Sequence, residues 1–172
     1  VGGEQFYVLN WDDNSDTVDL ISKYNLNQAG TAQQNASFNY TLCVFSSTNY
    51  WKSGFTGSPF DLNYFGGYMD TDAIGKAKSY GKSKGAASSR LLSYEEANEL
   101  KSKSSSNTKI YAMYRGTANT ANGFLLYWLG SANNTDDVWY VYGNDGNLGS
   151  DGFFVFRGGV RPVITVLKSK IS

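Results

Sequence analysis

The side chains that could carry chemistry in this sequence are carboxylates and tyrosines rather than imidazoles or thiols. The chain of 172 residues has no histidine and a single cysteine. Ser-His-Asp and Cys-His catalysis, and zinc or haem bound through histidine, therefore have no residues to use. Cys43 lies in an apolar run, where we expect a buried thiol. One cysteine also excludes an internal disulfide and a cysteine zinc site.

The carboxylates are the remaining candidates for catalysis or metal binding. Asp136, Asp137, Asp145 and Asp151 could supply the two carboxylates of a glycoside hydrolase, a reaction that needs no histidine. Nothing in the sequence fixes their separation. The acidic turn at 12–16 is rich in calcium-type ligands but lacks the full spacing of a calcium loop. We therefore predict no catalytic residue, no metal and no cofactor.

The composition favours a surface that binds. Aromatic residues make up 16% of the chain, 13 of them tyrosine, whereas charged residues are only 17%. Tyrosine with short polar neighbours is typical of binding loops, because a ring adds contact area at a low cost in entropy. The candidate ligand-binding residues are Asn133, Asn134, Asp136, Asp137, Tyr140, Tyr142, Asn144, Asp145, Phe154 and Phe156. The alternative is that these rings pack under helices or against another subunit. Strand alternation alone does not show which face is exposed to solvent.

A second group of residues is expected to be structural. Arg161 lies in an apolar strand, where a guanidinium must be hydrogen-bonded to be tolerated. Arg90 and Glu96 have the same interpretation. Trp128 and Trp139 lie on neighbouring predicted strands, and large rings at such positions usually belong to the core.

The elements that must position these residues give an α+β pattern in a single domain over 1–172. The opening segment, 1–24, reads as a hairpin with an acidic tip. Two helices are predicted in the stretch 70–103, the second starting from a capping box at Ser93 and Glu96.

The last part of the chain, 110–167, is predicted to be a strand meander with long loops. The segment 110–114 reads as a short strand or extended stretch. Four further strands are expected at 124–130, 138–142, 153–156 and 160–167. Four strands joined by short polar turns are expected to form a meander.

Charge and hydropathy limit the partners. The 15 basic and 15 acidic residues cancel, so that a nucleic acid or an anionic membrane would find no overall field to follow. No segment reaches the ~18 apolar residues that a membrane-spanning helix needs. Residues 1–3 do not resemble a secretory signal, so we read the chain as mature or truncated.

Four motifs occur in an order that resembles a known family. They are the runs 89–97, 127–131, 138–141 and 159–164, which contain Arg-Leu, Trp-Leu-Gly-Ser and closing Gly-Val-Arg-Pro sequences. This order is similar to that of bacterial and phage surface domains related to the formylglycine-generating-enzyme-like branch of C-type lectin folds. The resemblance implies a C-type-lectin-like domain in which two helices pack against one twisted antiparallel sheet, with the termini close together and a loop-rich face. Catalytic cysteines, metal-binding histidines and the calcium-site tripeptide of true lectins are absent from this sequence.

Relatives of this kind are displayed on cells, pili or virions. The resemblance therefore implies an extracellular or cell-surface location and no enzymatic activity. Our leading hypothesis is an adhesion domain that binds a glycan or a surface protein of another cell. The alternative is a structural subunit of a pilin-like filament, whose partners are neighbouring subunits; a glycosidase is the third hypothesis. We expect no nucleic-acid partner and no membrane span in this chain.

Overall fold

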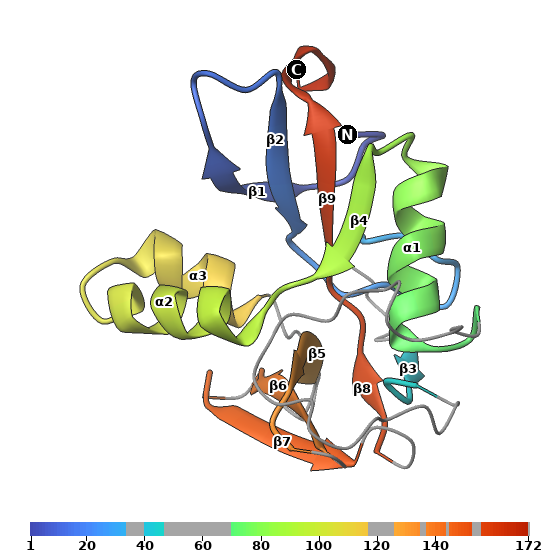
Figure 1. Ribbon diagram of the computed structural model, residues 1–172, viewed down its shortest axis with the longest axis vertical. Helices are drawn as coiled ribbons and strands as arrows, with labels where there is room; N and C mark the ends of the chain where they lie inside the picture. The colour runs from blue at the N-terminus through green and yellow to red at the C-terminus, as the bar shows by residue number, and fades with distance from the viewer. Residues whose placement is uncertain are drawn as a thin grey trace.

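The fold is seen in a computed structural model, which shows an α+β arrangement of two sheets and three α-helices (Figure 1). The structure describes residues 1–33, 40–46, 70–116, 126–134, 137–143, 145–152 and 156–171. The α+β class expected from the sequence is confirmed at this level. The prediction of one antiparallel sheet with two helices is wrong, because the strands divide between two sheets and a third helix is present.

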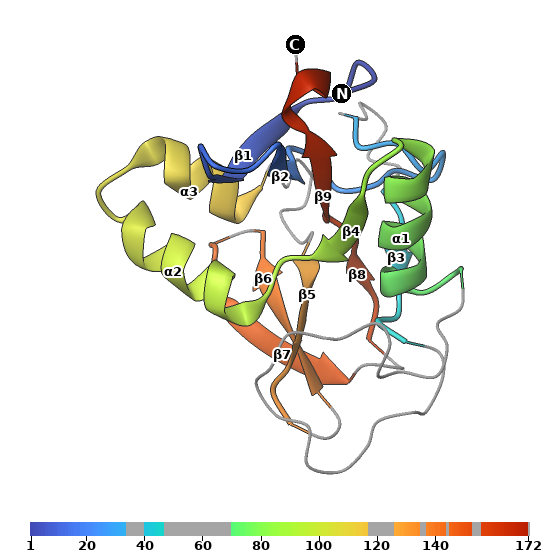
Figure 2. The same ribbon diagram turned by 45° about the horizontal axis from the view of Figure 1, so that its top comes forward.

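The first sheet joins the two ends of the described chain. Its strands are β1 (Phe6–Trp11), β2 (Thr17–Ser22), β9 (Pro162–Leu167) and β4 (Ser88–Leu91), in that order and all antiparallel. The hairpin predicted near the start of the chain is the β1–β2 pair. Both chain ends lie at the same end of the molecule, beside β9 (Figure 2).

The second sheet holds most of the candidate binding residues. Its order is β3 (Leu42–Cys43), β8 (Gly158–Gly159), β5 (Leu126–Ala132), β6 (Asp137–Tyr142) and β7 (Leu148–Gly152). Strands β5, β6 and β7 form an antiparallel meander, whereas β8 runs parallel to β5.

The helices lie on two sides of the first sheet. Helix α1 (Ala73–Ser83) packs against β4, while α2 (Tyr94–Ser104) packs against α3 (Thr108–Arg115) on the other side (Figure 1). A short 3-10 turn, Lys168–Lys170, follows β9.

The capping box predicted for α2 is confirmed. The Ser93 hydroxyl accepts a hydrogen bond from the Glu96 amide at 3.1 Å, and the Glu96 carboxylate accepts one from the Ser93 amide at 2.9 Å. Two amides of the first turn that no carbonyl could reach are thus satisfied, and the helix begins after β4.

The strand predicted at 110–114 is wrong, because these residues belong to α3. The Asn107 side chain accepts hydrogen bonds from the amides of Lys109 and Ile110, which starts a helix. Met113 and Tyr114 then turn towards the core. The aromatic and β-branched composition of this segment favours a strand, but the helix cap at Asn107 outweighs that preference.

The predicted meander over 110–167 also needs correction. Its last strand, β9, lies in the first sheet, and the third strand of the meander is β7 rather than 153–156. Residues 153–155 lie outside the described residues, and Phe156 is not part of a strand. The glycine-rich run 146–152 pairs with β6 because a strand can supply backbone hydrogen bonds with few bulky side chains.

Two apolar clusters fill the space between these elements. One contains Trp128, Val138 and Ile164, and the other contains Tyr127, Leu129 and Val163. Neighbouring residues of β5 thus enter different clusters, because successive side chains of a strand point to opposite faces. Both faces of the second sheet are therefore packed at β5, so β5 presents no ring to solvent.

Candidate functional site

Three aromatic rings of the predicted site gather on one face of the second sheet. Tyr140 and Phe156 stack with their centroids 5.7 Å apart and their planes 16° apart. Tyr142 lies beside Tyr140, with 5.9 Å between the centroids. Both rings of the stacked pair meet the edge or face of the buried Trp128. We call Tyr140, Tyr142 and Phe156 the aromatic face.

A glycine on the neighbouring strand makes room for this face. Gly149 pairs with Tyr140, and a Cβ built on Gly149 would lie 2.7 Å from the Tyr140 ring. No side chain larger than hydrogen fits there without moving the ring. The Tyr140 ring therefore lies across β7, with Trp128 on the inner side. All three members of the aromatic face are half-buried, so each is held in place yet remains in contact with solvent.

The electrostatic surroundings keep the Tyr140 hydroxyl neutral. Burial raises the pKa of Tyr140, and the nearby Asp151 and Tyr142 raise it further. Asp151 pairs with Val138 and so shares its face of β7 with Gly149 and the Tyr140 ring. A neutral phenol with a carboxylate close by can donate and accept hydrogen bonds, as hydroxyl-bearing ligands require.

The asparagines of the predicted site are separated from the aromatic face. The Asn133 side chain donates to the Ser150 hydroxyl at 2.9 Å, and Ser150 pairs with Trp139 on the opposite face of the sheet. Asn134 and Asp137 bind each other: the Asp137 amide donates to the Asn134 side chain, and the Asn134 amide group donates to the Asp137 carboxylate, both at 2.9 Å. These contacts close the β5–β6 turn.

Asp145 lies at the other end of β6. Its carboxylate accepts hydrogen bonds from the Asn147 amide at 2.9 Å and the Asn147 side chain at 2.7 Å. The hydrogen bond from the Asn147 amide is the main reason that the pKa of Asp145 lies below its ordinary value. Asp145 therefore holds the β6–β7 turn. Asp136, Asn144 and Phe154 lie outside the described residues.

The carboxylates considered for glycoside cleavage are not assembled in the described part of the chain. Asp137 and Asp145 flank β6 at its two ends. Asp151 pairs with Val138, and Asp137 pairs with Gly152, so the Asp137 and Asp151 side chains leave opposite faces. A pair facing one substrate across a short gap, as that reaction needs, is not formed by these three residues.

The residues expected to be structural occupy the junctions between elements. Trp128 is fully buried and donates from its indole nitrogen to the Cys43 carbonyl at 2.9 Å. Trp139 is half-buried and packs on Tyr94, at the start of α2, with 4.5 Å between the ring centroids.

Arg90 links β4 to the cap of α2. Its guanidinium donates to both carboxylate oxygens of Glu96, each at 2.8 Å, and reaches Asp19 on β2 at 3.4 Å. Burial raises the pKa of Glu96, but the hydrogen bonds from Arg90 and Ser93 outweigh it and hold that pKa below its ordinary value. The pair therefore stays ionised at neutral pH.

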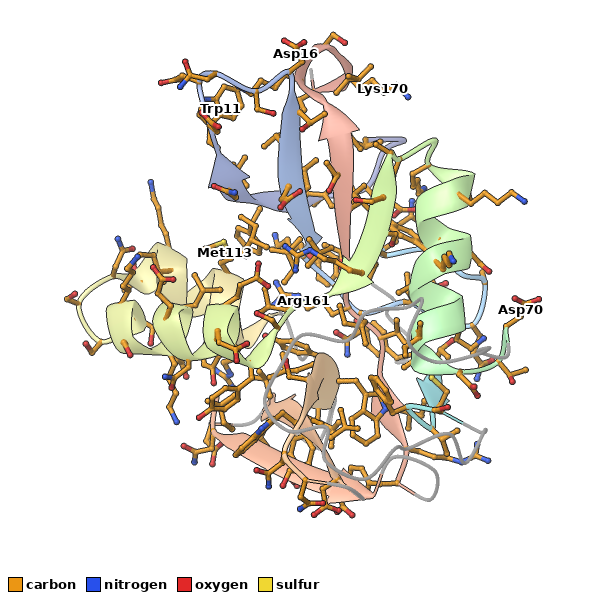
Figure 3. The ribbon with its side chains drawn as sticks, in the orientation of Figure 1. Trp11, Asp16, Asp70, Met113, Arg161 and Lys170 are labelled. Carbon is orange, nitrogen blue, oxygen red and sulfur yellow. The ribbon has the colours of Figure 1, made fainter. Side chains whose placement is uncertain are left out.

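Arg161 lies at the centre of the molecule, between the two sheets and α3 (Figure 3). Its side chain is fully buried and donates to the carbonyls of Ser22 at 2.8 Å, Met113 at 2.6 Å and Tyr114 at 3.3 Å. The ring of Tyr127 lies 5.1 Å from the guanidinium carbon. Burial lowers the pKa of Arg161. Its hydrogen bonds to backbone carbonyls and its contact with a core ring join β2, α3 and β5.

Cys43 is a buried thiol rather than a nucleophile. Its side chain is in the core, and burial is the main cause that raises its pKa to about 12. In the described ranges, no group of three or more Cys, Asp or Glu residues is placed to hold a metal ion.

The chain was compared with known protein families, curated proteins and solved structures. No match was found in any of the three comparisons. The resemblance of four motifs to surface domains of the C-type lectin type thus stands on the sequence alone. Among the described helices, none is both long and apolar enough to cross a membrane.

One exposed surface was missed by the sequence interpretation. Val8 and Trp11 on β1 are 47% and 54% exposed, and the Trp11 ring is held by Lys168, 4.4 Å from its centroid, and by a hydrogen bond to Asp13. The signal lies in the sequence: β1, the first strand, carries no charged residue. The register that leaves β1 at the edge of its sheet could not be read from the sequence.

Proposed function

We propose that this chain is a non-enzymatic recognition domain that acts outside the cell and binds a glycan or a protein through the aromatic face. The observation that carries the proposal is the Tyr140–Phe156 stack with Tyr142 beside it. Rings of this kind bind the C–H faces of sugars and the apolar parts of protein epitopes.

The support beneath the rings favours binding. Trp128 behind Tyr140 and Gly149 beside it fix the ring before any ligand arrives. A contact surface that is already ordered loses little entropy when a partner binds. The Asp151 carboxylate close to Tyr140 adds a hydrogen-bond acceptor for a hydroxyl or amide group.

The strand order supports the finer fold proposed from the motifs. The resemblance to C-type-lectin-like domains implies termini that lie close together and a loop-rich face. Here β1 and β9 share the first sheet, whereas β5, β6 and β7 form a meander in the second sheet. In this interpretation the second sheet is the face displayed to a partner on another cell.

The test is binding of the whole chain to a glycan panel and to whole cells, before and after replacing both Tyr140 and Tyr142 by alanine. We expect the double variant to lose at least about tenfold in affinity, because two hot-spot rings are removed. Y140F is the conservative variant that keeps the packing on Trp128. W11A removes an exposed ring from the first sheet and is the matched control.

Unchanged binding by a folded double variant would refute the aromatic face as the site. Thermal unfolding of each variant shows whether it is folded. Loss of binding in W11A alone would show that the binding site lies at β1.

A second candidate function is a structural subunit of a filament, and the free edge of the first sheet favours it. Strand β1 is the outermost strand, and no described strand pairs with its outer side. It presents exposed Val8 and Trp11 and has no charged residue of its own. Open apolar edges of this kind are templates for pairing with another chain.

Sedimentation from micromolar to millimolar concentration tests this candidate. A subunit that assembles through β1 should associate as concentration rises, and V8D should abolish the association without unfolding the exposed edge. A wild-type chain that stays monomeric throughout contradicts assembly through β1.

A further inference from the structure

A polar pocket lies where α1 begins, beside the edge strand β3. Its volume is about 350 Å³. The residues that line it and matter here are Thr41, Cys43, Thr71, Asp72, Lys76 and Arg157. None of them belongs to the aromatic face, although Arg157 directly follows Phe156 in the chain.

Two cations meet at this pocket from different parts of the chain. Lys76 comes from the start of α1, and Arg157 comes from the segment before β8. Within the described residues, neither side chain has a hydrogen bond or an ion pair. Both act electrostatically on Cys43, which lies in the pocket wall. Two cations that form no ion pair in the described residues therefore lie beside this hollow.

The helix end adds to the positive potential. Asp72 is the N-cap residue of α1, but its side chain makes no capping hydrogen bond. The Ala73 amide donates to the Val44 carbonyl at 3.1 Å, while the helix dipole favours a negative group near this end. The buried Asp72 is the one carboxylate among the lining residues, against the two cations Lys76 and Arg157.

We propose that this pocket binds the carboxylate or sulfate group of an acidic saccharide. An arginine binds such an oxyanion with two parallel hydrogen bonds, and a lysine adds a point charge. The proposal rests on the proposed function, because it takes the partner to be a glycan and names its chemical class. The anionic group lies between Lys76 and Arg157.

The rest of the lining suits a sugar. Thr41 and Thr71 supply hydroxyls, and Gln28 supplies an amide. A second hollow of about 200 Å³ shares Gln28, Thr41 and Lys76 with the first and continues along α1 past Ser79. The two hollows together offer room for a further sugar unit beside the anionic one.

The pocket is built for binding rather than reaction at sulfur. Cys43 is 6% exposed, and its thiol stays protonated at neutral pH. A thiol in this state is a poor nucleophile.

The experiment is an NMR titration of the whole chain with galacturonate, galactose 6-sulfate, galactose and inorganic sulfate. We expect at least one acidic sugar to bind about tenfold more tightly than galactose, with shifts at Thr41, Thr71 and the start of α1. R157Q and K76Q should each weaken that binding by about tenfold, because each removes one charged contact. K82Q removes an exposed charge from the same helix, outside both hollows, and should leave it unchanged.

Each outcome decides the proposal. Preference for galacturonate identifies a carboxylate site, and preference for galactose 6-sulfate identifies a sulfate site. Equal binding of galactose and both acidic sugars, or acidic binding that survives R157Q and K76Q, overturns the proposal. Binding of inorganic sulfate with no preference among the sugars also overturns it.

The two proposals fail separately. If neutral glycans bind and only the Tyr140 and Tyr142 replacements weaken them, the recognition function stands and the anionic pocket is refuted. If the acidic sugar binds at Arg157 but the tyrosine replacements change nothing, the pocket stands and the aromatic face is refuted.

Discussion

At the scale of single residues, Arg161 shows how a buried cation can hold a fold together. It is fully buried, and its hydrogen bonds go to backbone carbonyls of β2 and α3. A planar guanidinium offers five N–H donors in a fixed fork, whereas an ammonium group offers three from a single atom. The ring of Tyr127 adds a cation–π contact. The strand position between apolar neighbours predicted a hydrogen-bonded arginine, but not which carbonyls would bind it.

Replacing Arg161 by lysine should destabilise the protein. Lysine keeps the charge but leaves carbonyls of Ser22 or Met113 without a donor, so we expect the free energy of unfolding to fall by roughly 2–4 kcal/mol. Urea denaturation measures this change. The same replacement at the exposed Arg157 is the control and should cost less than about 0.5 kcal/mol. Equal stability of R161K and the wild type would contradict the role given to Arg161.

Cys43 should make stability depend on alkaline pH. Its pKa is raised to about 12 in the folded protein, chiefly by burial. An unfolded thiol ionises near about pH 8.5, so the contribution is complete below that pH and is lost as the pH rises towards 12. Wild type should lose about 1–2 kcal/mol more than C43A between pH 8 and pH 10, measured by urea denaturation at each pH. Parallel profiles for the two proteins would show that the thiol ionises normally.

At the scale of elements, local signals were read correctly where the side chain contacts its own backbone. The Ser93–Glu96 box is such a signal, because both partners lie within one turn. The start of α3 was missed although Asn107 is a good cap, because the ring-rich segment after it resembled a strand. Strand β7 was missed because its residues are glycines and small polar residues, whose pairing depends on β6 rather than on their own composition.

Removing the cap of α2 tests the element scale. S93A should lower the free energy of unfolding by about 1 kcal/mol, or the melting temperature by about 3 °C, because the Glu96 amide loses its acceptor. S93D retains a side-chain acceptor and should melt near the wild type. If S93A and S93D melt together, the capping contact contributes nothing to stability.

At the scale of the whole molecule, the division into two sheets was beyond the reach of the sequence. Strands β9 and β5 both read as apolar runs, and nothing local tells which sheet each one joins. The division into two sheets determines which side chains lie together at the candidate site. Tyr140 and Tyr142 were placed on one face by alternation, and the structure brings Phe156 to them. Asn133 and Asn134 do not join the aromatic face. Asn133 binds Ser150 on the opposite face of β7, and Asn134 closes the β5–β6 turn.

The central claim is that the aromatic face, and not the open edge at β1, meets the partner. The most direct measurement is hydroxyl-radical footprinting of the whole chain, free and bound to whole cells or to its native assembly. We predict protection of Tyr140, Tyr142 and Phe156 in the bound state, with Val8 and Trp11 labelled as in the free protein. Protection of Val8 and Trp11, with the aromatic face labelled as before, would contradict the recognition account and indicate a filament subunit joined through β1.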